Sequence, residues 1–157
     1  MKLIIGSDKG GFAVKEAIAE YLRETGIDFE DIGTKDVNNP MSHVEVASTA
    51  GELISNGKAD RGILVCGTGM GMAITANKFK GVYAALVESQ YAAVYARKIN
   101  DANVLCLGGF IVGPAMAKEI ADSFLHTEFL EKFPQWRIDY LTGQMQALKA
   151  VEDRVYG

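Results

Sequence analysis

The stretch of the chain best suited to chemistry is residues 64–72, which read LVCGTGMGM. An apolar run ends in Cys66, and three glycines then alternate with Thr68 and Met70. A glycine-rich turn that runs into a helix presents free backbone N–H groups to an anion, such as a phosphate, a carboxylate or an enolate oxygen. A thiolate beside those N–H groups can take a proton from carbon while they stabilise the resulting oxyanion. An aldose–ketose isomerisation needs this combination.

Spacing excludes several familiar uses of such a loop. A Walker loop needs Gly-Lys-Ser/Thr, whereas Gly71 is followed by Met72, and a dinucleotide fingerprint needs G-x-G-x-x-G after the first strand. A thiol phosphatase has an arginine where this chain has Met72, and a thioredoxin-type motif needs a C-x-x-C pair. A cysteine hydrolase needs a histidine partner, for which only His43 is available. Two interpretations of Cys66 are left: a proton-transferring thiolate, or a small core residue beside glycines that permit close packing.

The overall composition predicts one globular domain, residues 1–157. Hydrophobic residues make up 48% of the chain, which is enough for a full core. A formal charge of −4 without a basic block argues against nucleic-acid binding, and the absence of a run of about 18 apolar residues argues against a membrane span. Two distant cysteines and two isolated histidines form no metal-ligand pattern. The opening MKLIIGSDKGG is expected to be the first strand of a cytoplasmic protein rather than a signal segment.

Short apolar runs alternate with amphipathic stretches, which predicts a parallel, doubly wound (Rossmann-like) α/β sheet with right-handed crossovers. Strands are expected at 3–5, 27–33, 61–66, 81–87 and 103–109. Helices are expected at 12–25, 43–56, 67–78, 88–98, 114–125 and 135–155. Ser42 and Glu45 have the spacing of a capping box at the start of the second helix. Ligand sites in such sheets lie at the carboxyl ends of the strands, which is where the glycine loop falls.

Sequence motifs spread over nearly the whole chain indicate a family. In order they read GSDKGGFAVKEAI, DIGT, GILVCGTGMGMAITANKFKGVYAAL, NDANVLCLGG and IVG, and Arg137 follows near the start of the last helix. With these motifs the chain resembles the family of ribose-5-phosphate isomerase B and the galactose-6-phosphate isomerase subunits. The resemblance implies a five-stranded sheet in the order 2-1-3-4-5 and isomerisation of phosphorylated sugars through a cis-enediolate, without a cofactor or metal.

The resemblance also implies a homodimer or homotetramer whose active sites lie between subunits. The last helix, which follows a complete layered unit, is expected to pack on a partner subunit, with its own sheet as the alternative. Cys66 matches the catalytic base, and Asp8 matches the residue that contacts sugar hydroxyls. Asn100 matches an asparagine that reaches in from the partner subunit, and Arg137 matches a phosphate-binding arginine. The loop residues that match the group binding the enediolate oxygen are Gly67, Thr68, Gly69 and Gly71.

The chain departs from the ribose-5-phosphate isomerase pattern at five positions. Lys9 replaces a histidine in the first loop, and His43 replaces a tyrosine that faces the substrate. Ile99 replaces the histidine credited with opening the sugar ring. Phe110 and Phe133 stand where two further phosphate arginines are found. The departures therefore concern ring opening and the binding of the terminal phosphate.

These departures predict an isomerase whose substrate is not ribose 5-phosphate. Ile99 cannot transfer a proton, which matters little for a substrate too short to form a ring. The loss of two arginines removes charge-assisted hydrogen bonds and weakens phosphate binding. Lys9, beside Asp8, and Arg137 can each supply a compensating positive charge. His43 can hydrogen-bond a hydroxyl or replace the missing acid–base group. A four-carbon sugar phosphate such as erythrulose 4-phosphate is the expected substrate, and the alternative is a sugar-phosphate-binding subunit that is inactive alone or needs a complementary partner subunit.

Three further sets of residues have expected positions. Phe110, Phe133 and Trp136 are expected to form either an aromatic wall at the site or a cluster at a subunit interface. Lys98 forms no stripe with other lysines and is expected to be solvated. Cys106 lies in the middle of an apolar run and is expected to be a core residue.

Overall fold

The computed structural model describes residues 1–157, along which strands and helices alternate. The strands are β1 (Leu3–Ser7), β2 (Phe29–Asp31), β3 (Arg61–Cys66), β4 (Ala84–Leu86) and β5 (Val104–Gly108). The helices are α1 (Phe12–Glu24), α2 (His43–Ser55), α3 (Met70–Ala76), α4 (Gln90–Asn100), α5 (Pro114–Leu125) and α6 (Gln135–Tyr156). Every expected strand and helix is present, with ends that differ by a few residues.

The five strands form one parallel sheet in the order β2-β1-β3-β5-β4, which confirms the predicted α/β class. The predicted order, 2-1-3-4-5, is wrong for the last two strands. All residues of β5 are buried, whereas those of the shorter β4 are only partly buried. A central parallel strand is apolar on both faces, so β5 pairs with β3 and β4 takes the edge.

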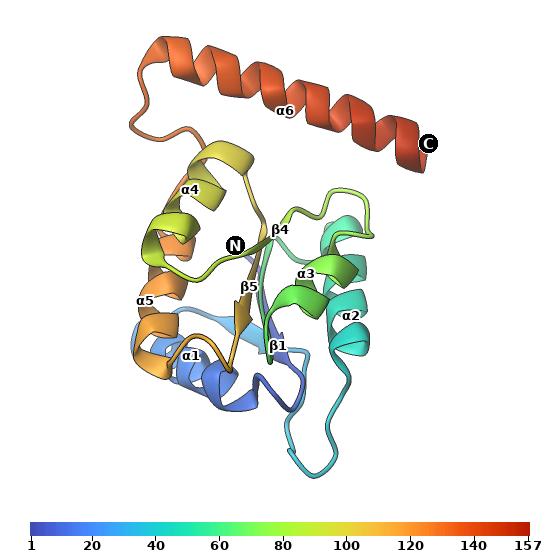
Figure 1. Cartoon of the computed structure of the whole chain (residues 1–157), viewed down its shortest axis with the longest axis vertical. Helices are drawn as coiled ribbons and strands as arrows, with labels where there is room; N and C mark the ends of the chain where they lie inside the picture. The colour runs from blue at the N-terminus through green and yellow to red at the C-terminus, as the bar shows by residue number, and fades with distance from the viewer.

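Helices cover both faces of the sheet (Figure 1). On one face α5 packs against α1 and α4, and on the other face α2 packs against α3. Two separate groups of buried apolar side chains lie between these helices and the sheet. The sheet is therefore buried on both sides, and only its two ends are free to form a site.

Local sequence signals fix the helices around the glycine loop. The backbone N–H of Glu45 donates to Ser42 Oγ (3.2 Å), and the Ser42 N–H donates to the Glu45 carboxylate (2.7 Å), which confirms the capping box at the start of α2. The bond from the Ser42 backbone also lowers the pKa of Glu45. α3 ends at Ala76, earlier than expected, because the side-chain amide of Asn77 pairs with the backbone of Ala84 at 2.8 and 2.9 Å.

The last helix, α6, crosses the end of the sheet at which the strands begin (Figure 1). Its C-terminal half is held on its own chain, because the Glu152 carboxylate accepts hydrogen bonds from the Gly81 N–H (2.5 Å) and the Tyr83 hydroxyl (3.0 Å). Burial and this bond raise the pKa of Tyr83 to about 12. Leu141 is the one buried residue of α6, so packing on a partner subunit stays a prediction. None of the helices has both the length and the apolar character to cross a bilayer.

Candidate active site

A cavity of about 370 Å³ opens at the end of the sheet where β1 and β3 finish. Eight residues line it: Asp8, Gly10, His43, Cys66, Gly67, Thr68, Gly71 and Phe110. Six of the ten residues expected at the site are therefore brought together around one space. Asp8 is the one charged residue among them, and the lining contains no lysine or arginine.

Cys66 is the last residue of β3 and stands between the core and the cavity. Its side chain belongs to the buried cluster under α2 and α3 and is 5% exposed. Its Sγ accepts a hydrogen bond from the backbone N–H of Gly69 (3.1 Å), the residue that immediately precedes α3. Cys66 is thus buried and also lines the cavity. Its position is compatible both with a proton-transferring thiolate and with a small core residue. Cys106 is fully buried, as expected of a core residue, and burial raises the pKa of its thiol.

Two of the loop glycines are in contact with aromatic rings. A Cβ atom on Gly71 would lie 2.6 Å from Cδ2 of His43, and a Cβ atom on Gly67 would lie 2.6 Å from Cε2 of Phe110. Gly69 does not line the cavity. Its φ of +77° and the closeness of the Leu107 backbone favour glycine at this position, and its N–H donates a hydrogen bond to Cys66 Sγ. The glycines therefore allow an imidazole and a phenyl ring to lie directly on the loop.

His43 is the first residue of α2, directly after the capping box that fixes the start of that helix. The imidazole is partly buried and lines the cavity. A neutral imidazole can donate a proton from one nitrogen and accept one at the other. The structure therefore places an acid–base group in the same cavity as the cysteine, as the sequence predicts, although its role in catalysis stays a prediction.

The first loop brings Asp8 to the cavity but leaves Lys9 outside it. Asp8 Oδ1 accepts a hydrogen bond from the Gly11 N–H (3.0 Å), and this bond closes the turn before α1. Gly11 must be glycine, because a Cβ atom there would lie 2.2 Å from the carbonyl oxygen of Val65. Lys9 is exposed and is not among the lining residues, so the expectation that it faces the substrate gains no support within one chain.

Asn100 and Arg137 lie at the opposite end of the sheet. Asn100 is the last residue of α4, which leads into the start of β5, and Arg137 is in the first turn of α6. Cys66 ends β3, whereas these two residues belong to the end where strands begin (Figure 1). Neither residue lines the cavity of its own chain, so their expected place at the site stays a prediction.

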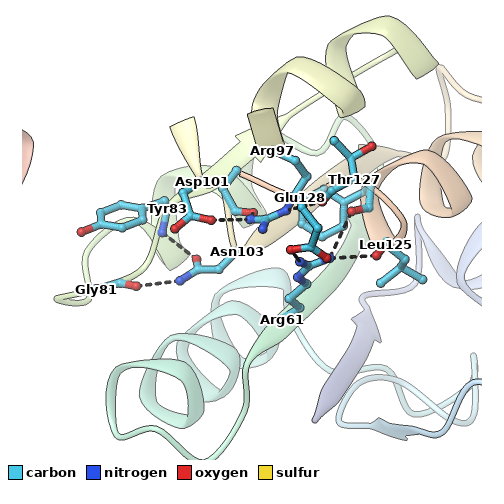
Figure 2. A network of polar contacts seen from close by, with 11 residues as sticks. Arg61, Gly81, Tyr83, Arg97, Asp101, Asn103, Leu125, Thr127 and Glu128 are labelled. Carbon is cyan, nitrogen blue, oxygen red and sulfur yellow. Dashed lines mark hydrogen bonds and ion pairs between the residues drawn. The ribbon is translucent and has the colours of Figure 1, made fainter. Parts of the chain in front are cut away.

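A network of polar contacts fixes the backbone that follows Asn100 (Figure 2). Arg97 is 4% exposed and donates to the Asp101 carboxylate (2.9 Å), the Ala102 carbonyl (2.6 Å) and the Thr127 carbonyl (3.2 Å). Asp101 has a φ of +48° and ends α4. The spacing of Arg97 and Asp101, four residues apart on one helix, is the only sequence signal of this network.

Arg61 forms the second part of the network shown in Figure 2. Its guanidinium donates to the carbonyls of Phe124 and Leu125 (3.3 and 3.0 Å), the last two residues of α5, and lies 3.6 Å from the Glu128 carboxylate. Burial, followed by the nearby charge of Arg97, lowers the pKa of Arg61. The network binds helix ends to one another, and its arginines are occupied by the protein itself.

The aromatic residues do not gather at one site. Phe110 lines the cavity, whereas Phe133 lies at the opposite end, within 4.2 Å of the Arg137 guanidinium and the Lys98 ammonium, measured to the ring centroid. The single aromatic wall is therefore not formed within one chain. Lys98 was expected to be solvated, but its charged group lies over a ring. No three His, Cys, Asp or Glu side chains are arranged to hold a metal, and the lack of a cofactor in the reaction stays a prediction.

Comparisons with known proteins agree with this fold. Residues 3–141 match the model of the family described as Ribose/Galactose Isomerase. The chain is 48% identical to 4-deoxy-4-sulfo-D-erythrose isomerase from Clostridium sp. (strain MSTE9), over 99% of this chain and 98% of that protein. It is 40% identical to D-erythrulose-4-phosphate isomerase from Pectobacterium atrosepticum, over 82% and 85%. The structure of ribose-5-phosphate isomerase B from Clostridium thermocellum superposes with a TM-score of 0.88 at 35% identity, covering 99% of both chains.

The fold and the cavity at the carboxyl ends of the strands define a doubly wound sugar isomerase. The chain belongs to the ribose/galactose isomerase family, which confirms the resemblance inferred from its motifs. Its relatives and structural neighbours are aldose–ketose isomerases, and they include enzymes of short-chain sugars.

Proposed function

We propose that this chain interconverts 4-deoxy-4-sulfo-erythrose and the corresponding 2-ketose, 4-deoxy-4-sulfo-erythrulose. The observation that carries the proposal is the cavity lining, in which Phe110 lies on the glycine loop and no lysine or arginine is present. A phosphate monoester carries about −1.5 to −2 charges at neutral pH, whereas a sulfonate carries one. Phe110 and Phe133 stand where the ribose-5-phosphate isomerase pattern has two arginines, so fewer positive charges remain for the terminal anion, which suits the monoanion better. The 48% identity to an isomerase of this sugar supports the same choice.

The substrate's length explains a second feature of the chain. A four-carbon aldose with a sulfonate on C4 has no hydroxyl that could close a five-membered ring. Ring opening is then unnecessary, and an apolar residue such as Ile99 can replace the proton-transferring histidine found in ribose-5-phosphate isomerases. A pentose phosphate, by contrast, would need that step.

The proposed reaction moves one proton between neighbouring carbons. The Cys66 thiolate removes the proton from C2 of the aldose, and the electrons of the C–H bond form the C1–C2 double bond of a cis-enediolate as O1 takes up negative charge. Backbone N–H groups of the cavity-lining loop residues Gly67, Thr68 and Gly71 stabilise that oxygen. A proton passes from O2 to O1 through His43, and Cys66 returns its proton to C1 as the C2 carbonyl forms. Asp8 orients the hydroxyls, and atoms and charge balance without an external reagent.

The proposed active site is shared between two copies in a homodimer or homotetramer. Asn100 and Arg137 lie at the end of the sheet opposite Cys66, so a partner subunit would present them to the cavity. The alternative, a binding subunit that is inactive alone, is less well supported, because both Cys66 and His43 line the cavity.

A second candidate substrate is erythrulose 4-phosphate, which interconverts with an aldose phosphate of the same length. A 40% identical relative carries this activity in its name, and Arg137 could meet a phosphate as well as a sulfonate. The two substrates differ only in the terminal anion, so direct competition between them decides the assignment.

The test is to incubate the purified chain in deuterated water with each of three substrates and to follow exchange and isomerisation by proton NMR. The substrates are 4-deoxy-4-sulfo-erythrulose, erythrulose 4-phosphate and ribose 5-phosphate. We expect kcat/KM to be highest for the sulfonate, and lower for ribose 5-phosphate by about 100-fold or more, equivalent to about 3 kcal/mol of transition-state stabilisation. Equal or better turnover of ribose 5-phosphate would refute the proposal. A preference for erythrulose 4-phosphate would assign the second candidate instead.

A further inference from the structure

Two cations meet on one aromatic ring at the end of the sheet where the strands begin. The ammonium of Lys98, in the last turn of α4, and the guanidinium of Arg137, in the first turn of α6, each lie 4.2 Å from the centroid of Phe133. The two charged groups are therefore within twice that distance of each other.

Neither cation is neutralised by the protein. The ion pairs of the chain involve Lys15, Arg61, Lys80, Arg97, Lys118 and His126, so Lys98 and Arg137 have no carboxylate partner. The nearby arginines of Figure 2 differ in this respect, because carboxylates and carbonyls occupy their guanidinium groups. Two like charges held close together without a counter-ion repel each other, and a bound anion would remove that cost.

The start of α6 adds further donors for an anion. Pro134 precedes the helix, no side chain caps it, and its first turn contains no acidic residue. The backbone N–H groups of Gln135 and Trp136 make no hydrogen bond. A cation in a first helical turn is opposed by the helix dipole, so Arg137 occupies a position that stability alone does not favour. Two cations without a carboxylate partner thus lie on the ring that closely precedes an uncapped helix.

The positions of the two cations are fixed by the neighbouring backbone and rings. The N–H of Leu130 donates to the carbonyl of Lys98 (3.1 Å), which ties the segment before α6 to the end of α4. The Tyr95 ring lies 6.4 Å from Phe133, and the Lys98 ammonium is 5.7 Å from Tyr95. The Lys98 ammonium therefore lies beside two aromatic rings.

We propose that Lys98, held beside Arg137 on the Phe133 ring, supplies a second positive charge for the terminal anion of the sugar substrate. The inference rests on the proposed function and specifies how the substrate anion is recognised. Arg137 is expected there from the family resemblance, whereas Lys98 is identified only by the contacts of the fold. In a shared active site this pair would serve the Cys66 cavity of the partner subunit, which has no cation of its own.

The first test measures anion binding without catalysis, using inorganic sulfate as the probe. Trp136 is the single tryptophan of the chain and neighbours Arg137, so its fluorescence, together with the NMR shift of the Arg137 amide, reports on the subsite. We expect a saturable response to sulfate at constant ionic strength, weakened about 10-fold or more in Lys98→Gln. Lys80→Gln, a charge loss at a lysine paired with Asp153, should leave binding unchanged. No response in the native chain, or an equal response in Lys98→Gln, would overturn the proposal.

The second test separates charge recognition from structural damage. We expect Lys98→Gln to lower kcat/KM for the sulfonated four-carbon ketose by about 10- to 100-fold and to leave kcat/KM for unsubstituted erythrulose within about 2-fold. Lys98→Arg should restore most of the loss. An equal loss with both sugars would show that Lys98 is only structural. Failure of the native chain to isomerise any four-carbon sugar would refute the proposed function, while the sulfate titration would still decide the role of Lys98.

Discussion

The two ends of the sheet differ in the chemistry that they present. Where the strands finish, the cavity around Cys66 is lined by loop glycines, an imidazole and one carboxylate, but by no lysine or arginine. Where the strands begin, Lys98 and Arg137 have no counter-ion and lie against one ring. One end is suited to proton transfer and the other to holding an anion. In the proposed shared site, association between copies would bring these two ends together.

The largest loss of activity is expected when the proposed base, Cys66, is removed. Cys66→Ala should lower kcat by about 1,000-fold or more, because a positioned acid–base group contributes up to about four orders of magnitude. Steady-state isomerisation and deuterium exchange measure the loss. Cys106→Ala is the matched control: it removes a thiol that is fully buried in the neighbouring strand, so activity per folded molecule should be kept. Substantial exchange in Cys66→Ala would show that another group is the base.

A smaller effect is expected from moving His43 without removing it. In Gly71→Ala the new methyl group would lie 2.6 Å from the imidazole and displace it. We expect kcat to fall by about 10- to 100-fold, while the midpoint of thermal unfolding holds or rises because alanine favours helix. Gly143→Ala, in α6, has no atom near the new methyl group and should raise stability without loss of activity. An unchanged kcat in Gly71→Ala would argue against a role for His43.

The smallest expected effect concerns the preference between anions. Phe110→Arg adds a cation to a cavity that has none, so erythrulose 4-phosphate should gain about 10-fold in kcat/KM relative to the sulfonate. The ratio of the two values, measured in competition, is the readout. Ile111→Arg, at an exposed neighbour outside the lining, should leave the ratio unchanged. A ratio that is also unchanged in Phe110→Arg would show that Phe110 does not determine the choice of anion.

The sequence predicted the surroundings of Cys66 better than those of Phe133. Cys66, its glycines and the Ser42 capping box are local patterns in which neighbours in the chain are neighbours in space. The exchange of β4 and β5 was missed because both are short apolar runs, and only pairing with β3 shows which of them is buried on both faces. Lys98 was missed because its aromatic partner, Phe133, lies on a different segment, and no local spacing links the two.

The measurement that tests the account most directly is to mix two inactive variants. Cys66→Ala damages one end of the sheet and Arg137→Gln the other, so each mixed dimer would contain one intact site. After dissociation and reassociation of equal amounts, we predict recovery of about a quarter of the native activity. Mixing Cys66→Ala with Gly71→Ala, which damages the same end, should recover none. No recovery in the first mixture, despite demonstrated subunit exchange, would contradict a site shared between the two ends of the sheet.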